Sequence, residues 1–143
     1  MTAHNRSRYS RYAGGPDPLK GQGSLVAPTF AHGLLYAAGG TTPSGDPGAV
    51  VALDPLTGAL RWKHITPGFV FAGMPALGDV LVVVSNSLDG SKSWLELLDA
   101  STGAQLKQFE TSGPTYGAPS VGRGLILWYP FSGQLRALAI PPP

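Results

Sequence analysis

The chain has 143 residues, of which 43% are apolar and only 13% are charged, and its formal net charge is +2. This charge is too small to indicate a nucleic-acid-binding protein, and no apolar run is long enough to predict a membrane-spanning helix. Because the chain has no cysteine, it holds neither a disulfide nor a c-type haem attachment motif of its own.

Residues 1–23 form a segment with a composition of its own. It contains four of the ten basic residues, interleaved with two tyrosines, a pattern that leaves open contact with phosphates or a membrane surface. The alternative, which we favour, is a flexible lead-in outside the packed domain. No apolar stretch follows the basic residues, so nothing in this segment resembles a signal peptide. The basic residues are Arg6, Arg8, Arg11 and Lys20, and the tyrosines are Tyr9 and Tyr12.

The rest of the chain repeats one pattern three times. The stretch APTFAHGLLYAAGG begins at Ala27, MPALGDVLVVVS begins at Met74, and APSVGRGLILWY begins at Ala118. A second phrase follows the first two copies, VVALDPLTGALRW from Val50 and LELLDASTGAQLK from Leu95. The prolines of the first phrase are 47 and 44 residues apart. A period of this length, built from short apolar runs, is typical of propeller blades.

The second copy shows the expected plan of one blade. Gly78-Asp79 predicts a tight hairpin turn, and residues 86–93 predict a longer polar turn. The apolar runs between these turns predict four antiparallel strands of one sheet. The expected strands are Phe71–Leu77, Val80–Ser85, Trp94–Asp99 and Gln105–Glu110.

The first copy follows the same plan with a longer second turn, Gly39–Gly48, and an alternating last strand, Ala59–His64. The third copy predicts only three strands, Tyr116–Val121, Leu125–Tyr129 and Gln134–Ile140. Three prolines follow it, and proline cannot donate to a strand ladder.

We therefore predict an all-β partial β-propeller with about three four-stranded antiparallel blades, the last one incomplete. The expected blades are about residues 24–66, 69–111 and 114–140 of a domain spanning 24–143. Because a ring typically needs four to eight blades, the first and third blades would each leave an apolar face without a neighbour. The expected partners are the remaining blades of a larger propeller or further copies of the chain, with a protein partner also possible.

The phrase ALDPLTGALRW resembles the repeat of pyrroloquinoline-quinone (PQQ) dehydrogenase-type propellers, in which an Ala-x-Asp-x-x-Thr-Gly-x-x-x-Trp pattern docks one blade on the next. Asp54 and Thr57 are suited to accept backbone N–H bonds in a turn. Gly58 can supply a positive φ, and Trp62 can bury its ring between sheets while its indole N–H donates to a backbone carbonyl.

The second copy keeps only part of this docking motif. Asp99, Thr102 and Gly103 match it, whereas Lys107 stands at the position of Trp62 and Phe109 is expected to take over some of the packing. In the third copy, Ala137-Leu138-Ala139 matches the third strand, but the aspartate of the motif and the Thr-Gly turn are absent. This progressive loss of the motif along the chain indicates the closing, C-terminal part of a propeller.

The polar residues do not form a recognisable reactive site, and we predict no catalytic and no metal-binding residues. The three histidines share no metal-ligand spacing, and three further aspartates stand in turns beside glycine or proline, where backbone bonding favours aspartate. The serines lack the Gly-x-Ser-x-Gly pattern of a nucleophile, and inter-sheet packing explains the remaining aromatic residues better than ligand binding does. These residues are His4, His32, His64, Asp46, Asp79, Asp89, Ser85, Ser87, Ser91, Trp94, Trp128 and Tyr129.

Two functions fit this sequence. The preferred one is a propeller module that acts as a structural or binding scaffold and is not catalytic on its own. The alternative is the C-terminal part of a PQQ-dependent dehydrogenase that oxidises an alcohol, a sugar or a polymeric alcohol. In that family PQQ and calcium sit over the axis of a complete propeller, and no position here matches a quinone-site motif. The resemblance implies a periplasmic or extracellular location.

Overall fold

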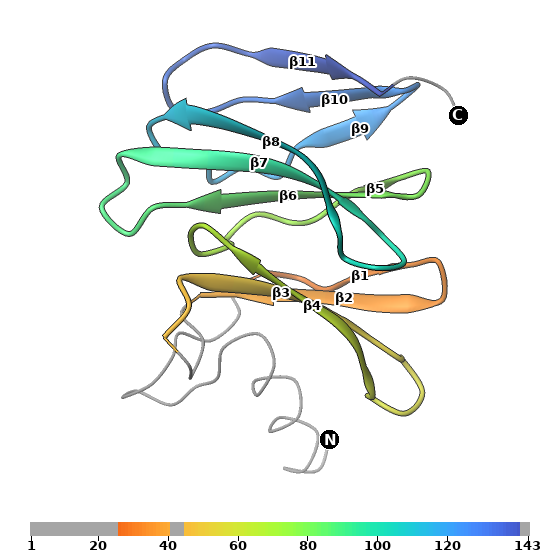
Figure 1. Ribbon diagram of the computed structural model, residues 1–143. Coiled ribbons are helices and arrows are strands. Elements are labelled where there is room, and N and C mark those ends of the chain that lie inside the picture. Colours follow the sequence, from red (N-terminus) through yellow and green to blue (C-terminus); the bar gives the residue numbers. More distant parts are fainter. Residues whose placement is uncertain (1–25, 41–44, 141–143) are drawn as a thin grey trace.

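The structure is a computed structural model that describes residues 26–40 and 45–140 (Figure 1). Its eleven strands form three antiparallel sheets of four, four and three strands, and the described residues include no helix. The predicted all-β class and the incomplete third sheet are therefore confirmed. The lead-in, residues 1–23, lies outside the described residues.

Sheet 1 takes its strands in chain order, β1-β2-β3-β4. The β3–β4 pairing contains an irregularity between Ala52 and Leu53, next to the turn that starts at Asp54. The strands are β1 (Thr29–Ala31), β2 (Leu34–Gly39), β3 (Gly48–Leu53) and β4 (Leu60–Thr66).

Sheet 2 repeats this arrangement, β5-β6-β7-β8, and its irregularity lies at the matching place, between Leu97 and Leu98. The strands are β5 (Ala76–Leu77), β6 (Val80–Asn86), β7 (Lys92–Asp99) and β8 (Gln105–Ser112).

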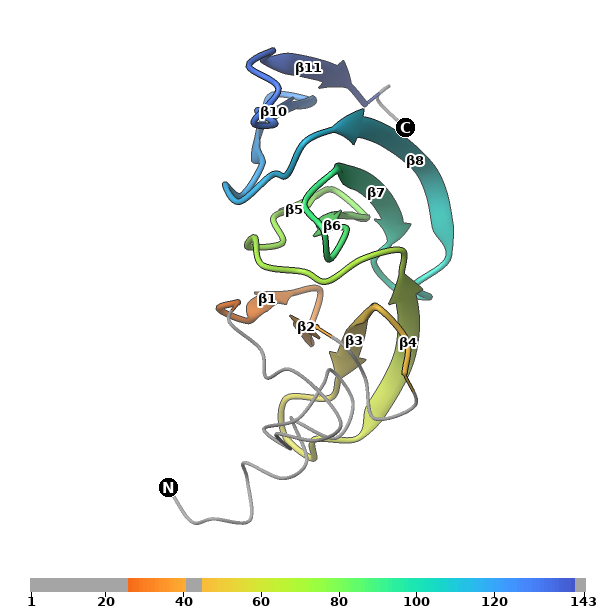
Figure 2. The same ribbon diagram turned by 90° about the vertical axis from the view of Figure 1, so that its left-hand side faces the viewer.

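Sheet 3 has the order β11-β10-β9 and stops after three strands. They are β9 (Ser120–Gly122), β10 (Leu125–Trp128) and β11 (Arg136–Ala139). The sheets are stacked face to face, and the last strands of the complete sheets, β4 and β8, lie along the outside of the curved stack (Figure 2).

A two-residue turn between the first and second strands occurs in all three sheets and defines equivalent positions in them. His32-Gly33, Gly78-Asp79 and Arg123-Gly124 each join the first strand of a sheet to the second. Positive φ angles of +53° at His32 and +49° at Arg123 are unusual for residues with a Cβ, but two-residue hairpins favour them because they match the twist of the strands. Leu34, Val80 and Leu125 are therefore equivalent, and so are the residues that follow them.

Alternating side chains pack each sheet against its neighbour. Tyr36 and Ala38 point from sheet 1 into a cluster with Leu81 and Val83 of sheet 2. Val82 and Val84 point from the other face of sheet 2 toward Ile126 and Trp128 of sheet 3. Successive side chains of β6 point to opposite faces of sheet 2. Because both faces are covered by neighbouring sheets, β6 contains a continuous apolar run.

The two outer faces of the stack differ. On sheet 3, Leu125 and Leu127 are 42% and 39% exposed, as expected for an uncovered apolar face. On sheet 1, the central side chains of the outer face, Ala37 and Val51, are fully buried, and no further sheet covers this face among the described residues. Burial of these side chains is consistent with the cost of exposing a contiguous apolar surface.

The first strands are shorter than the sequence predicted. β5 begins at Ala76 rather than Phe71, and β9 begins at Ser120 rather than Tyr116. Pro75 and Pro119 precede these strands, and a proline provides no N–H for a ladder bond. The predicted strand Gln134–Ile140 likewise shortens to β11.

Candidate functional site

The turn between β3 and β4 is organised by Asp54. The backbone N–H groups of Leu56 and Thr57 each donate to Asp54 Oδ1 over 3.0 Å, and Arg61 Nη2 donates to Oδ2 over 2.7 Å. These contacts, the Thr57 N–H first and Arg61 second, lower the pKa of Asp54 to about 2. Gly58 adopts φ +68° within this turn. Thr57 Oγ1 accepts the N–H of Ala59 over 3.2 Å.

The turn between β7 and β8 has the same construction. Asp99 Oδ1 accepts the N–H groups of Ser101 and Thr102 over 2.9 and 2.8 Å, and the Ser101 hydroxyl donates to it over 2.7 Å. The Ser101 hydroxyl, followed by the Thr102 N–H, lowers the pKa of Asp99. Gly103 adopts φ +74°. The two turns are therefore structural repeats as well as sequence repeats.

Sheet 1 reaches this second turn through two aromatic side chains. Trp62 Nε1 donates to Ala100 O over 3.1 Å, and the Tyr36 hydroxyl donates to the same oxygen over 3.0 Å. The Trp62 ring lies against Gly103, where an added Cβ would come within 2.5 Å of Trp62 Cε3. Burial, followed by the charge of Asp99, raises the pKa of Tyr36. The structure thus brings Trp62 together with Asp99, Thr102 and Gly103.

Tyr36 was not singled out from the sequence, although its alternation with Leu35 and Ala37 gave a signal of inward orientation. The side chain of Asp54 accepts hydrogen bonds from the backbone of Leu56 and Thr57 and from Arg61.

The interface between sheets 2 and 3 uses different residues. Lys107, at the position equivalent to Trp62, is exposed, and its Nζ lies 5.3 Å from the centre of the Phe109 ring. Phe109 packs against the apolar cluster between the two sheets. Trp128 donates from Nε1 to Thr115 Oγ1 over 3.2 Å, and Asn86 Nδ2 donates to Thr115 O over 2.9 Å. Sequence reasoning missed this polar junction because its members lie in three separate segments.

A polar pair of a partly buried histidine and a buried glutamate lies between sheets 1 and 2. His64 Nε2 is 3.1 Å from Glu96 Oε1, although the two residues are 32 positions apart. Gln108 Nε2 donates to the same oxygen over 3.4 Å, and Glu96 is fully buried. Glu96 Oε2 and Ser85 Oγ are buried without a hydrogen-bond partner. The fold thus brings a carboxylate from the next sheet to His64, a contact that the sequence analysis did not predict.

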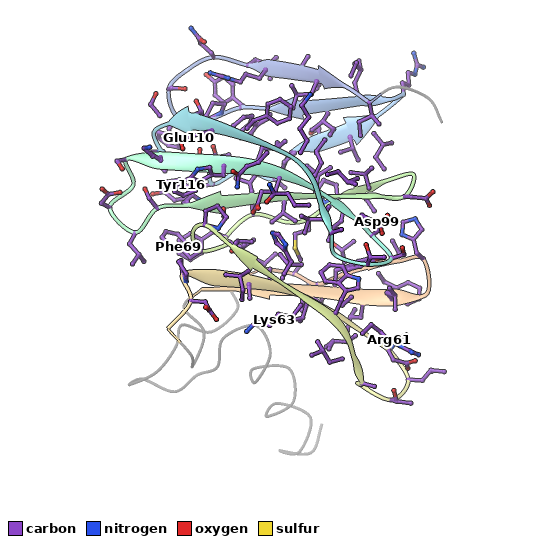
Figure 3. All side chains as sticks on the ribbon, viewed as in Figure 1. Arg61, Lys63, Phe69, Asp99, Glu110 and Tyr116 are labelled. Atoms are coloured by element: carbon purple, nitrogen blue, oxygen red, sulfur yellow. The ribbon has the colours of Figure 1, made fainter. Side chains whose placement is uncertain are left out.

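The uncovered face of sheet 3 continues into an open groove of about 480 Å³. Its aromatic wall extends a row of rings in which Phe71 and Tyr116 lie 6.5 Å apart and Tyr116 and Phe131 lie 5.6 Å apart. Figure 3 shows Phe69 and Tyr116 at one edge of the stack and Asp99 at the opposite edge. The groove is lined by Tyr116, Gly117, Ala118, Ser120, Leu127, Tyr129, Phe131 and Leu135.

The other polar residues considered from the sequence have local roles. Asp89 accepts the Ser87 hydroxyl over 2.7 Å and the Ser91 N–H over 3.0 Å, contacts that lower its pKa to about 2. Asp46 lies 3.7 Å from Lys63 Nζ, and Trp94 donates to Glu110 over 3.0 Å. The Asp79 backbone oxygen accepts the N–H of Ala100 over 2.9 Å. His4 lies outside the described residues.

Solved structures show which fold this stack has. BamB from Moraxella catarrhalis matches with a TM-score of 0.63 and 18% identity over 82% of this chain and 32% of that one. A europium-containing methanol dehydrogenase matches with a TM-score of 0.54 and 19% identity over 88% of this chain and 26% of that one. Both have the PQQ-like β-propeller fold. This chain has that fold too.

The chain spans about a third of the BamB structure and about a quarter of the dehydrogenase structure. No protein-family model matches the sequence, and no curated protein matches it. No helix among residues 26–40 and 45–140 has the length and apolar character to cross a membrane.

The described residues do not gather the ligands of a calcium site. Nowhere in the described part of the chain do three His, Cys, Asp or Glu side chains gather as metal ligands. The buried carboxylate, Glu96, points between two packed sheets and is held there by His64 and Gln108.

Proposed function

We propose that this chain is a β-propeller repeat module that acts as a structural or binding scaffold and is not catalytic on its own. The observation that carries the proposal is the exposure of apolar side chains on the outer face of sheet 3. Leu127 and Tyr129 are 39% and 62% exposed there, while the equivalent Val82 and Val84 of sheet 2 are buried against the next sheet. A face built for stacking and left open favours a function in assembly.

The docking motif supports the same function. In the proposal, Trp62 of one blade fastens onto the Asp99, Thr102 and Gly103 turn of the next, and the blades correspond to about residues 24–66, 69–111 and 114–140. The Asp54, Thr57 and Gly58 turn would receive the equivalent side chain of a preceding blade. The bonds that keep both turns in one shape support this assignment.

The expected occupants of the open face are further blades of a larger propeller or another copy of the chain, and the finished surface would bind a protein partner. Loops on a rigid propeller are well suited to that task. On the basis of the PQQ-like resemblance we also propose a periplasmic or extracellular location and a position near the C-terminal end of the propeller.

The second candidate is part of a dehydrogenase that oxidises an alcohol or sugar. The likeness in fold to a methanol dehydrogenase favours it. In this case PQQ and calcium would be held by a complete propeller, with residues that the described part of this chain does not supply.

One titration separates the two candidates. The protein that carries this chain would be titrated with PQQ and calcium, and dye reduction would be followed with methanol, longer alcohols and sugars. The scaffold proposal predicts no quinone binding and no turnover. Saturable binding with alcohol-dependent dye reduction would overturn it in favour of the dehydrogenase.

A further inference from the structure

Four buried polar side chains meet between sheets 2 and 3, and together they form the polar junction. The Thr115 hydroxyl accepts the indole N–H of Trp128 over 3.2 Å and lies 2.9 Å from the Ser93 hydroxyl. The Asn86 amide accepts the backbone N–H of Thr115 over 2.6 Å and donates to its C=O over 2.9 Å. All four residues are at most 1% exposed, so each of these polar groups depends on the others for a partner.

The repeat gives the equivalent positions between sheets 1 and 2. The hairpin turns that relate the sheets match two of the four positions, and the registers of β2–β3 and β6–β7 match a third. The fourth follows from a bond that Asn86 N donates to Phe69 O over 2.9 Å, because Phe131 N and Pro114 O form the same bond one repeat later. The equivalent pairs are Gly40 and Asn86, Gly48 and Ser93, Val70 and Thr115, and Val83 and Trp128.

None of these equivalent positions between sheets 1 and 2 carries a polar side chain. Val70 and Val83 pack in the apolar cluster there, and the other two residues are buried glycines. A serine would not fit at Gly48, since an added Cβ would collide with the backbone oxygen of Gly68. The two interfaces therefore differ at the same four places: one joins polar side chains, and the other has no side chain that could bond to them.

Docking in the wrong order would leave buried polar groups without partners. Sheet 3 placed on sheet 1 would meet two glycines instead of Asn86 and Ser93, and the Thr115 C=O would lose its donor. Sheet 2 of a second copy placed on sheet 2 would bring Val70 to the Ser93 hydroxyl. Each buried group left unpaired lowers the equilibrium constant for docking by about tenfold or more. Such penalties on the wrong partner are one source of specificity.

We propose that the polar junction fixes the order in which the sheets stack. The face of sheet 2 with Asn86 and Ser93 selects sheet 3 by the Thr115 hydroxyl. It rejects a sheet with valine at that position, such as sheet 2 of a second copy. The inference rests on the proposed scaffold function and names the residues by which one sheet recognises the next. Misassembly is a characteristic failure of repeat proteins, and the junction opposes it.

Distances between spin labels test the order of the sheets. The chain has no cysteine, so Leu88→Cys and Gln134→Cys place one label in the β6–β7 turn and one in the β10–β11 turn, both at exposed positions. Labelled chains are diluted with unlabelled chains, so that pulsed electron paramagnetic resonance records distances within one chain. The original chain is expected to give a single distance, because its own sheet 3 lies beside its sheet 2.

The test variant removes every polar side-chain group of the junction. The share of wrongly docked chains is expected to rise about tenfold for each unpaired group that no longer penalises wrong docking. A second distance should then accompany the original one. A folded variant that keeps only the original distance would overturn the proposal. The four substitutions are Asn86→Gly, Ser93→Ala, Thr115→Val and Trp128→Phe.

Two single variants decide the question if circular dichroism shows that the fourfold variant is unfolded. Thr115→Val keeps the shape of the threonine side chain and loses its hydroxyl, whereas Thr115→Ser keeps the hydroxyl. Only Thr115→Val is expected to give a second distance. Identical distance distributions for the two variants would overturn the proposal, because a junction that only adds stability does not select the order of the sheets.

The distances and the quinone titration separate this inference from the scaffold proposal. A single distance in every folded variant, in a protein that binds no quinone, would reject the junction as the device that orders the sheets and would leave the scaffold proposal standing. Quinone binding with turnover would reject the scaffold function whatever the distances are.

Discussion

Gly103 and Gly58 occupy the same position in two equivalent turns, but only Gly103 lies under a tryptophan. Both have positive φ, +74° and +68°. An added Cβ at Gly103 would collide with the Trp62 ring, whereas no atom of the described residues lies within 4 Å of one at Gly58. The same residue type therefore has one role in the isolated turn and a second role in the contact between sheets.

Alanine substitutions separate these roles. Gly58→Ala is expected to lower the free energy of unfolding by about 1–2 kcal/mol, the cost of a left-handed backbone at a residue with a Cβ. Gly103→Ala should cost about 1–3 kcal/mol more, because the tryptophan must shift. Urea denaturation of both variants measures the difference. Equal losses would show that the Trp62–Gly103 contact is not closely packed.

A second prediction for a single residue concerns Asp54, which is expected to make the stability of the fold depend on pH. Its pKa is lowered to about 2 in the folded chain, from an ordinary value near 3.9. A lowered pKa stabilises the fold above the ordinary value and loses this contribution as pH falls toward 2. Asp54→Asn should therefore flatten the fall of the unfolding free energy between about pH 4 and 2. Parallel curves for the two proteins would contradict the assignment.

Between elements, one contact of sheet 1 with sheet 2 runs from β4 to the turn after β7. Trp62→Phe removes the indole N–H that reaches Ala100 O while keeping an aromatic ring. The expected loss of stability is about 1–2 kcal/mol, from the missing bond and the smaller ring. Trp94→Phe is the matched control, because its indole bonds to Glu110 at an exposed site and should cost less. Equal effects in thermal denaturation would argue against a docking role for Trp62.

The pair His64 and Glu96 links the same two sheets through a partly buried histidine and a buried carboxyl group. His64→Leu removes a main partner of a fully buried carboxyl group, and a loss of about 3 kcal/mol is expected. The double variant His64→Leu, Glu96→Leu should recover most of that loss, since no buried carboxyl group remains. A double-mutant cycle in urea measures the coupling. A double variant that is less stable than His64→Leu alone would show that the pair contributes net stability.

Element boundaries were the least predictable part of the fold. Alternation and turn residues located β4, β6, β7, β8, β10 and β11 to within two residues at each end, because side-chain period and turn chemistry are local properties. The first strands of sheets 2 and 3 were predicted too long, since Phe71 and Tyr116 fit a strand pattern. Both rings instead join an aromatic row formed by the connections between sheets, a contact that no local pattern records.

For the whole molecule, the open face of sheet 3 predicts association. The chain is expected to self-associate in sedimentation, and Leu127→Glu should shift it toward monomer because a charge on this face opposes burial. Leu56→Glu is the control, since Leu56 lies in the β3–β4 turn and is 95% exposed. Far-UV circular dichroism would verify that both variants fold. A monomeric original chain would contradict the proposed stacking function of this face.

The sequence by itself determined the strand period, the threefold repeat and the two Asp-turns, because each depends on residues close together in the chain. Only the tertiary structure decided what these parts meet: Trp62 on Ala100 and Gly103, His64 on Glu96, and Trp128 on Thr115. It also decided that the centre of the outer face of sheet 1 is buried while that of sheet 3 lies open. Contacts between sheets join residues far apart in sequence, so their partners follow from how the blades stack and not from any local pattern.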